Sequence, residues 1–294
     1  MVVTVIIVNY KSEQLTIDYI TKELSKLTTP YNVIVVNNAA TPESDSVLCN
    51  GLQAELISKE RFKESLNNRY VVSSKENLGF AKGNNLGTEI AVKYLNPEYL
   101  LFSNNDILIN ETDIVCKMIA KFEKNNKIGI LGPKVIGLQG ELQSPEPYIS
   151  FLDRYCWMYL ATPFISLKTK RERFKLDYTN NAQEGFHYKI MGSFFMVKSD
   201  DFVNCGMMDP HTFLYAEETI LTERMKIIGK EPYYMPTVSV VHAHGLTTKG
   251  TIGKKGINKY MLESEKYYYH KYMNTPKWQI MLGELIYKLY CKIK

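Results

Sequence analysis

Residues 1–10 are MVVTVIIVNY, an apolar, largely β-branched run that ends in Asn9 and Tyr10. The run Val2–Val8 predicts a strand buried on both faces, because its hydrophobic side chains are consecutive rather than alternating. Similar short runs follow at Val33–Val36, Tyr70–Ser73, Tyr99–Ser103 and Ile128–Val135. Helical patterns separate several of them, over residues 12–27, 84–94 and 111–125. This alternation predicts an α/β fold with a Rossmann-like, mostly parallel sheet flanked by helices.

The second half of the sequence is less regular. Residues 137–184 contain Pro145, Pro147, Pro163 and clustered aromatic residues, and we interpret them as an insertion that shapes a substrate pocket or as a solvated excursion. Beyond it we expect a buried element over Ile190–Val197, a helix over Glu217–Ile228 ended by Gly229, and a strand over Val238–His242.

Composition and cysteine usage indicate an ordinary globular protein of a reducing compartment. Of the 294 residues, 45% are hydrophobic and 23% are charged, and no apolar run is long enough to span a bilayer. The first residues lack the features of a signal peptide. Five widely spaced cysteines without a CxxC pair argue against a disulfide framework or a zinc site. We therefore expect a cytoplasmic protein.

The net charge of +5 is concentrated at the C-terminal end, where residues 253–294 hold nine lysines and three glutamates. A basic tail favours contact with an anionic membrane surface, or a flexible segment that closes over phosphate, and it argues against a nucleic-acid partner. As a helix, residues 276–294 place most of their charges on one narrow face and apolar side chains on the rest. Such a helix suits the interfacial zone of a membrane, with docking on its own domain or a homodimer interface as alternatives.

Polar side chains follow four of the expected strands. They are Asn9-Tyr10, Asn37-Asn38, Glu76-Asn77 and Asn104-Asn105-Asp106. Ligands of parallel α/β sheets bind beyond the carboxyl ends of the strands, so these residues are candidates for a binding site. Asp106, an oxygen ligand at a strand end, suits Mg²⁺ or Mn²⁺ that shares a substrate phosphate, although Asn-Asn-Asp is also a common turn.

The segment Asn77–Asn85 (NLGFAKGNN) joins a strand to a helix. Gly79 and Gly83 allow close backbone approach, and a helix beginning after Asn84 offers N–H groups to phosphate, with Lys82 adding charge. The segment is neither a Walker loop nor GxGxxG, so it does not indicate an NTPase or a dinucleotide-binding protein.

Two further groups are candidates for chemistry. Adjacent Glu217 and Glu218 open an expected helix, where one can act as a general base or both can simply favour the helix dipole. His242 and His244 occupy alternate positions at the end of a strand, where one can bind a metal, although a lone histidine is more often structural.

Taken in order, these segments resemble the family 2 glycosyltransferases, particularly a rhamnosyltransferase-like branch. The resemblance rests on TVIIVNY (Thr4–Tyr10), VVNN (Val35–Asn38), NLGFAKGNNLG (Asn77–Gly87), SNND (Ser103–Asp106), GSFFM (Gly192–Met196), FLYAEE (Phe213–Glu218), Gly229 and His242-Ala-His244. It implies a GT-A fold over residues 1–252, with a nucleotide-sugar half at 1–110, an acceptor-side half at 111–252, and a basic amphipathic tail at 253–294.

The resemblance also implies a metal-dependent, inverting glycosyltransferase. The donor would be a UDP-, dTDP- or GDP-sugar and the acceptor a glycan or lipid-linked hydroxyl, in the assembly of a bacterial surface polysaccharide such as capsule or O-antigen. Asp106 would bind Mg²⁺ or Mn²⁺, with His242 and His244 as further candidate ligands, and Glu218 would be the base, with Glu217 as the fallback. The residues expected to form the donor site are Asn9, Tyr10, Asn37, Asn38, Asn77, Gly79, Phe80, Lys82, Asn84, Asn85, Asn104 and Asn105.

Three departures from the family pattern leave other functions open. Asn104 replaces the first acid of Asp-x-Asp, Asn37 or Asn38 replaces the acid after the second strand, and Glu217-Glu218 replaces Glu-Asp, with Ile220 where a further acid is usual. An inactive sugar-nucleotide-binding or glycan-binding domain is therefore an alternative. A sugar nucleotidyltransferase is less favoured, because no glycine follows the first strand.

Overall fold

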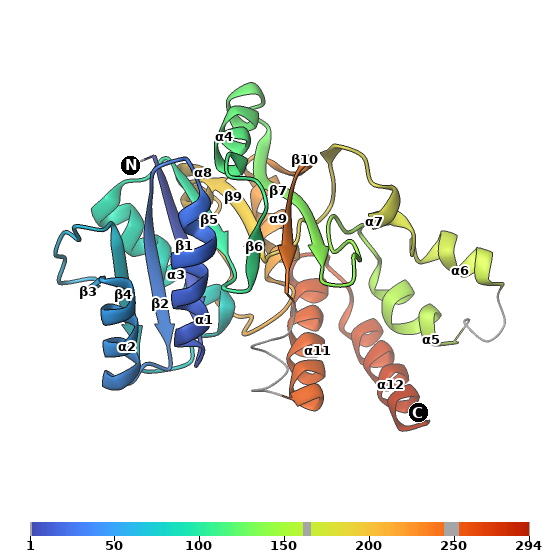
Figure 1. Ribbon diagram of the computed structural model, residues 1–294. Coiled ribbons are helices and arrows are strands. Elements are labelled where there is room, and N and C mark those ends of the chain that lie inside the picture. Colours follow the sequence, from blue (N-terminus) through green and yellow to red (C-terminus); the bar gives the residue numbers. More distant parts are fainter. Residues whose placement is uncertain (1, 161–165, 244–252, 294) are drawn as a thin grey trace.

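The computed structural model describes residues 2–160, 166–243 and 253–293 (Figure 1). Its strands are β1 (Val3–Asn9), β2 (Tyr31–Asn38), β3 (Glu55–Ile57), β4 (Arg69–Ser74), β5 (Tyr99–Ser103), β6 (Ile107–Ile109), β7 (Ile128–Gly137), β8 (Gly185–Phe186), β9 (Phe194–Lys198) and β10 (Glu231–His242). Within the described residues they form one sheet in the order β3-β4-β2-β1-β5-β9-β7-β10-β6, with β8 paired to β10.

The sheet is mostly parallel, as the sequence predicts. Strands β1 to β5 run parallel to one another, and β7 and β10 are parallel to each other. The antiparallel strands are β9 between β5 and β7, β6 at the edge, and the short β8. Because β5 and β7 both pair antiparallel with β9, the carboxyl ends of all the parallel strands lie along one edge of the sheet.

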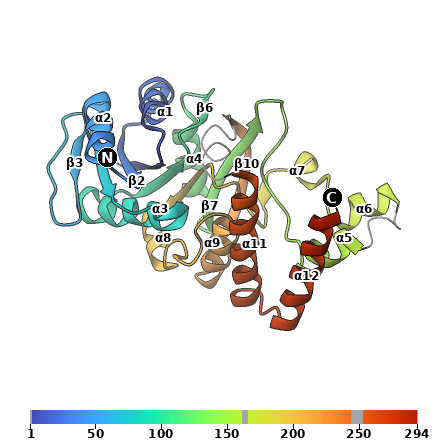
Figure 2. The same ribbon diagram turned by 90° about the horizontal axis from the view of Figure 1, so that it is seen from below.

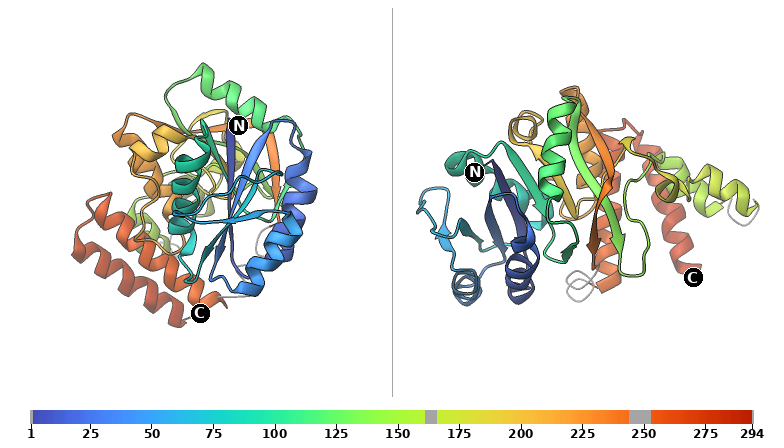
Figure 3. Two further views of the ribbon diagram at one scale, coloured as in Figure 1. Left: turned by 90° about the vertical axis from the view of Figure 1, so that its left-hand side faces the viewer. Right: turned by 45° about the horizontal axis from the view of Figure 1, so that its top comes forward.

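Helical segments cover both faces (Figure 3). They are α1 (Glu13–Asp18), η1 (Tyr19–Glu23), η2 (Leu24–Lys26), α2 (Pro42–Leu52), α3 (Gly79–Ile90), η3 (Ala91–Leu95), α4 (Ile114–Lys124), η4 (Asp153–Trp157), α5 (Met158–Leu160), α6 (Leu167–Arg173), α7 (Tyr178–Asn181), α8 (Ser199–Asn204), α9 (Glu217–Ile227), α11 (Gly253–Lys271) and α12 (Lys277–Ile293).

The core has one hydrophobic cluster on each face of the sheet. Alternate residues of β1 point to opposite faces, so Val5 and Ile7 pack with α1, α2 and α4, whereas Ile6 packs with α3, α8 and α9. A third cluster joins η4, α9, α11 and α12 through Phe151, Ile220, Tyr269 and Ile280. The irregular insertion and the C-terminal helices are therefore packed against α9.

Several boundaries differ from the sequence prediction. Helix α2 and strand β3 are additional to the predicted elements. Helix α2 begins with a capping box at Thr41-Pro42, which a hydrophobic pattern does not reveal. Helix α3 begins at Gly79, not after Asn84, and β10 begins at Glu231 rather than Val238. Ser12 precedes α1, but its side chain makes no capping hydrogen bond. Gly229, with φ of +74°, ends α9 as expected.

The C-terminal region forms two helices that lie side by side below the sheet (Figure 2). Helix α12 packs against η4 and α5, where Gly283 lies against Phe151 and Ile280 is buried. Its opposite side remains exposed, with Met281 70% exposed and Trp278 63% exposed. No described helix has both the length and the apolar character needed to cross a membrane.

Candidate active site

The polar strand ends meet at one edge of the sheet, as expected for parallel strands. The register pairs Asn9 with Asn37, and Asn38 with Ser74. On the other side of β1, Ser103 pairs with Phe194, which brings the Gly192-Ser193 turn to the same edge. At the far side, His242 pairs with Ile107, next to Asp106. The sheet thus brings Asn9, Asn37, Asn38, Asp106 and His242 to one edge.

Asn9 and Asn37 form a network that faces helices α1 and α2. The Asn9 amide donates to Asn37 Oδ1 at 2.9 Å and to Glu13, while its oxygen accepts from Ser12 and Thr16. Asn37 donates to Ser44 and Asp45, both at 2.8 Å. In this conformation the Asn9 amide has no hydrogen-bonding capacity left for a ligand, so its role is to hold the residues at this edge of the sheet in place. Tyr10, which follows it, is half-buried and remains accessible to a ligand.

Asn38 holds the loop before α3. Its amide donates to the Gly79 carbonyl at 3.1 Å and to Asn77 Oδ1 at 3.3 Å, and its oxygen accepts the Leu78 N–H at 3.0 Å. Gly79 has φ of +75°, and a Cβ there would collide with the Phe213 carbonyl. A glycine is therefore required at this position on both conformational and steric grounds.

The helix start that the phosphate site at this loop was expected to use lies elsewhere. Because α3 starts at Gly79, the N–H groups after Asn84 lie inside the helix. Two of the N–H groups at its actual start are already used: that of Gly79 by Asn77 Oδ1, and that of Phe80 by the Phe213 carbonyl at 3.0 Å. Gly83 instead allows α3 to pack on β1, since a Cβ there would lie 3.0 Å from Val8.

The remaining asparagines and the lysine of this segment have different surroundings. Asn84 is buried and bonds back to the Phe80 carbonyl. Asn85 exchanges two hydrogen bonds with the Met208 backbone, at 2.8 and 3.1 Å, and so ties α3 to the loop before α9. Lys82 is exposed. Of these three side chains, only that of Lys82 is exposed to solvent, where a donor can reach it.

In the segment Asn104–Asp106 the three side chains diverge. Asn105 is buried and donates to Ser12 at 2.9 Å and Thr16 at 2.8 Å, under α1. Asn104 is half-buried, and its backbone N–H donates to the Ser193 carbonyl at 2.8 Å. Asp106 is 6% exposed, and its backbone carbonyl accepts from Ala243. Asp106 therefore lies next to β10, on the opposite side from Asn105.

Asp106 and His242 form the candidate metal pair. His242 Nε2 lies 3.3 Å from Asp106 Oδ1, within ion-pair distance, yet that oxygen accepts no hydrogen bond from any described residue. His242 Nδ1 lies 2.7 Å from Gln143 Oε1. Since an amide oxygen only accepts, the proton sits on Nδ1, which is the usual outer partner of a metal-binding histidine.

The donor set fits a hard divalent cation that is completed by substrate. Among the described residues there is no cluster of three or more His, Cys, Asp or Glu side chains able to hold a metal. Two protein ligands are typical of Mg²⁺ or Mn²⁺ sites in which phosphate oxygens and water supply the other positions. His244 lies outside the described residues.

Glu217 and Glu218 differ sharply in environment. Glu217 is buried, and its Oε2 has no hydrogen-bond partner among the described residues. Burial raises the pKa of Glu217 well above its usual range, and the charge of Glu218 adds to the shift. Glu218 is half-buried instead. Of the two, Glu218 is the one that solvent, and hence a substrate, can reach.

Glu218 lies against the turn that leads to the metal pair. A Cβ on Gly192 would be 2.6 Å from Glu218 Oε1, so the carboxylate rests on the bare backbone of that glycine. The next residue, Ser193, accepts the Asn104 N–H. A short path of contacts therefore connects Glu218, Gly192, Ser193 and Asn104, two residues before Asp106.

Several residues near this edge were not found from the sequence. Gln143 orients His242, and Lys189 pairs with Glu146 at 2.7 Å close to Glu218. Burial opposes the Lys189 charge, but Glu146 and then Glu218 raise its pKa. Asp209 accepts from Tyr267 of α11 and from Tyr272, just after that helix, and so anchors the loop before α9. These residues follow no short motif, because their partners are distant in the sequence.

Comparison with known proteins identifies the class. Residues 4–199 match the family model described as glycosyl transferase family 2. The chain therefore belongs to glycosyl transferase family 2, and its sheet and helices have the GT-A architecture of that class. A search among curated proteins found no similar sequence.

Solved structures support the fold. One is a mannosyltransferase, PcManGT, from Pyrobaculum calidifontis, in complex with GDP-Man and Mn²⁺. It has a TM-score of 0.58 and 14% identity, over 94% of this chain and 65% of that one. Another is S. aureus TarS 1-349, with a TM-score of 0.51 and 15% identity, over 92% of this chain and 72% of that one. This chain spans slightly less than two thirds of the mannosyltransferase, and 40% of a longer TarS structure.

Proposed function

We propose that this chain is a metal-dependent, inverting glycosyltransferase that moves a hexosyl or rhamnosyl unit from a nucleoside-diphosphate sugar to an acceptor hydroxyl. One observation carries the proposal: an accessible carboxylate, Glu218, and the Asp106–His242 pair are gathered at one sheet edge by the Gly192-Ser193 turn. Family membership and the GDP-Man and Mn²⁺ in the mannosyltransferase structure are consistent with such a donor and cation.

The protein groups divide the chemistry between them. Glu218 accepts the proton of the acceptor hydroxyl as that oxygen attacks the anomeric carbon from the face opposite the diphosphate. Glu217 is buried, so an acceptor hydroxyl cannot reach it and it takes no proton from substrate. Asp106 and His242 would hold Mg²⁺ or Mn²⁺, which supplies positive charge for the leaving diphosphate when bound. The remaining accessible candidates for donor contacts are Tyr10, Phe80, Lys82 and Asn104.

Release of nucleoside diphosphate tests the proposal. The full chain is incubated with UDP-, dTDP- and GDP-sugars in the presence of Mn²⁺ or Mg²⁺, with and without EDTA. We expect release from one nucleotide class that EDTA abolishes. A sugar-nucleotide-binding domain without activity would be stabilised against heating by the same nucleotides but would release none. Release of pyrophosphate from a nucleoside triphosphate and a sugar phosphate would instead indicate a nucleotidyltransferase.

We further propose that α12 attaches the enzyme to an anionic membrane surface, where a lipid-linked acceptor for capsule or O-antigen synthesis would lie. The support is the exposed apolar side of α12, whose buried side is already docked on η4 and α5. Its members are Trp278, Met281, Leu282, Leu285 and Leu289. A helix with this division suits the lipid interface, and the lysines nearby favour anionic headgroups.

Vesicle flotation tests the membrane proposal. Met281→Glu with Leu285→Glu should abolish binding of the full chain to anionic vesicles, while Leu138→Glu, at another exposed leucine, should not. Equal flotation of both variants would contradict it. Loss of a dimer in the first variant, seen by sedimentation without any vesicle binding by the wild type, would instead identify a homodimer interface.

A further inference from the structure

Two residues in the left-handed conformation lie directly before the glutamates of α9. Tyr215 has φ of +70°, and Ala216, the N-cap of α9, has φ of +62°. A residue with a side chain is disfavoured there, and such residues normally occur singly, so the surroundings must hold this turn. Because Glu218 is the second residue of α9, the conformation of the turn sets the position from which its side chain extends.

The backbone just before the turn is held by two different helices. The Phe213 carbonyl accepts a hydrogen bond from the N–H of Phe80, at the start of α3, at 3.0 Å. The next carbonyl, that of Leu214, accepts from Ser264 Oγ of α11 at 2.8 Å. The ring of Phe213 also packs against Tyr260 of α11, with centroids 4.7 Å apart. The turn therefore follows a segment that is attached on both sides.

Ser264 has no other evident task. It is 6% exposed, and among the described residues its hydroxyl bonds only to the Leu214 carbonyl. A serine inside a helix usually faces solvent or bonds back to a carbonyl of its own helix, whereas this one reaches across to another segment. A buried hydroxyl costs free energy unless it is hydrogen-bonded, so the bond to Leu214 is retained whenever α11 is in place.

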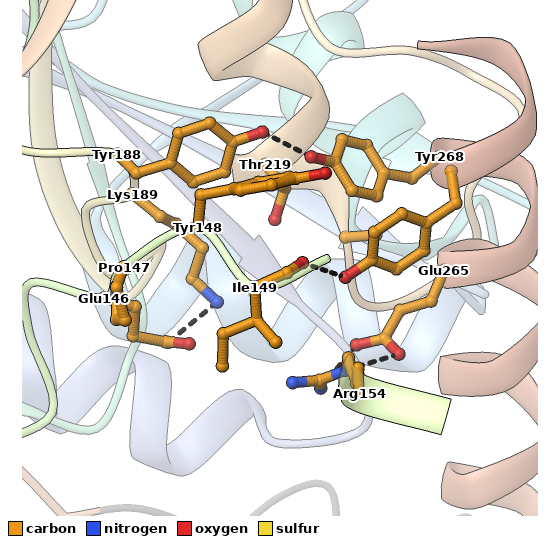
Figure 4. Close-up of a pocket in the computed structure, with 12 residues that line it drawn as sticks. Glu146, Pro147, Tyr148, Ile149, Arg154, Tyr188, Lys189, Thr219, Glu265 and Tyr268 are labelled. Carbon is orange, nitrogen blue, oxygen red and sulfur yellow. Dashed lines mark hydrogen bonds and ion pairs between the residues drawn. The ribbon is translucent and has the colours of Figure 1, made fainter. Parts of the chain in front are cut away.

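Helix α11 is a fixed support for this hydroxyl. Glu265, the residue after Ser264, pairs with Arg154 of η4 at 2.5 Å (Figure 4). Tyr269, one turn further along, donates to the Ile149 carbonyl at 2.7 Å. The helix therefore cannot shift without breaking its contacts with the insertion, and the position of Ser264 is set by them.

The other attachment of this loop to α11 is more remote from the turn. Tyr267 of α11 donates to Asp209 at 2.9 Å, near the beginning of the loop. Leu214, by contrast, directly precedes the two left-handed residues. Loss of the Asp209 contact therefore loosens the loop as a whole, whereas loss of the Ser264 contact frees the turn itself.

We propose that Ser264 is a positioning residue for Glu218. Its hydrogen bond keeps the Tyr215-Ala216 turn in the left-handed conformation and so directs the Glu218 carboxylate toward the hydroxyl that it deprotonates. The inference rests on the proposed function, because it takes Glu218 as the base. Without the bond the turn relaxes toward more favourable backbone angles, and the first residues of α9 move with it.

The kinetics of the full-length Ser264→Ala variant test the proposal. The probe is the nucleotide sugar that the wild type turns over with Mn²⁺, with water as the acceptor. We expect kcat to fall roughly ten- to a hundredfold, the scale of a small misplacement of a reacting group, with an unchanged KM for the nucleotide sugar. Ser264→Thr keeps the hydroxyl and should retain most of the turnover. Ser199→Ala is the control, since that buried hydroxyl has no partner among the described residues.

Two double variants separate positioning from a general loss of structure. Ser264→Ala should cause no further loss in a Glu218→Gln background, because the base is already absent. Ala216→Gly should restore part of the turnover of Ser264→Ala, because glycine adopts a positive φ without support. Melting curves show whether each variant folds.

Three results would overturn the proposal. They are wild-type kcat in folded Ser264→Ala, additive losses with Glu218→Gln, and failure of Ser264→Ala to fold, which would assign the bond to the fold as a whole. A wild type that releases no nucleoside diphosphate, or a Glu218→Gln variant with near-normal turnover, would instead refute the proposed function, so the two failures are distinguishable.

Discussion

The two sides of the proposed catalytic centre are built differently. On the donor side, β1, β2, β4 and β5 have asparagines at or just after their ends, whose amides bond mainly to neighbouring loops and to one another. On the opposite side, tyrosines and two ion pairs from three distant segments enclose a cavity. The donor side is thus formed by short local motifs that the sheet brings together. The other side forms only after the insertion and α11 have packed on α9.

This difference predicts how each side responds to substitution. The donor side and the base should be sensitive to single side chains, because few groups there face a substrate. Substitutions on the side formed by α9, α11 and the insertion should change the stability of the protein and its choice of acceptor. The following variants test that division, beginning with the largest expected effect.

Asp106→Asn should reduce metal-dependent release of nucleoside diphosphate to background. The substitution keeps the shape but removes the charge that a divalent cation requires, while His242 remains in place. Release is measured over a Mn²⁺ titration, with Asp200→Asn on the exposed side of α8 as the control. Full wild-type activity in EDTA, or an active Asp106→Asn protein, would rule out this role.

Glu218→Gln should lower turnover by roughly two to four orders of magnitude, the range for loss of a general base. Donor binding, followed by thermal stabilisation, should persist. Glu217→Gln is the matched control: a neutral amide is a close substitute for a buried carboxyl with a raised pKa, so turnover should stay near normal. The reverse pattern would move the role to Glu217, and near-normal turnover in both would leave the mechanism without its base.

Gly192→Ala should lower turnover by up to roughly a hundredfold, because the new Cβ would lie 2.6 Å from Glu218 Oε1 and displace it. The effect acts through Glu218, so it should disappear in a Glu218→Gln background. A double-mutant cycle of turnover measures this coupling. Additive losses would show that Gly192 matters for another reason.

Asp209→Asn should destabilise the fold with little direct effect on chemistry. Burial acts to raise the Asp209 pKa, but hydrogen bonds from Tyr272, the His211 amide and Tyr267 outweigh it and hold the pKa at about 2. The free carboxyl titrates near ~3.9, so the charged form stabilises the fold by on the order of 2 kcal/mol at neutral pH.

This contribution depends on pH in a defined direction. It is fully present above the unfolded-state pKa and is lost as the pH falls from about 4 to about 2. The difference in melting temperature between wild type and Asp209→Asn should therefore shrink as the pH is lowered over that window. A difference that is constant down to pH 2 would contradict the assignment. Asp200→Asn serves again as the exposed control.

The same division explains what the sequence could predict. Apolar runs and the residues after them located β1, β2, β4 and β5 and placed Asp106 at the site edge, because both signals are local. The helix start in the Asn77–Asn85 segment was misplaced because it is fixed by Asn38, Asn77 and Phe213, two of which lie outside that segment. No sequence pattern pointed to Lys189, Glu146 or Tyr148, because their surroundings form only when α11 packs beside them.

The contacts between these loops also bear on how the sequence can drift over evolutionary time. The Asn104–Ser193 bond and the Phe80–Phe213 bond are both made by main-chain atoms. The spacing between the loop that bears Asp106 and the loop before β9 is therefore insensitive to which side chains those residues carry, and so is the spacing between the start of α3 and the loop before α9. Position 104 can exchange an acid for an amide without shifting its neighbours. Glycine at 79, by contrast, cannot be exchanged, so the tolerance of this centre is uneven and is set by its backbone.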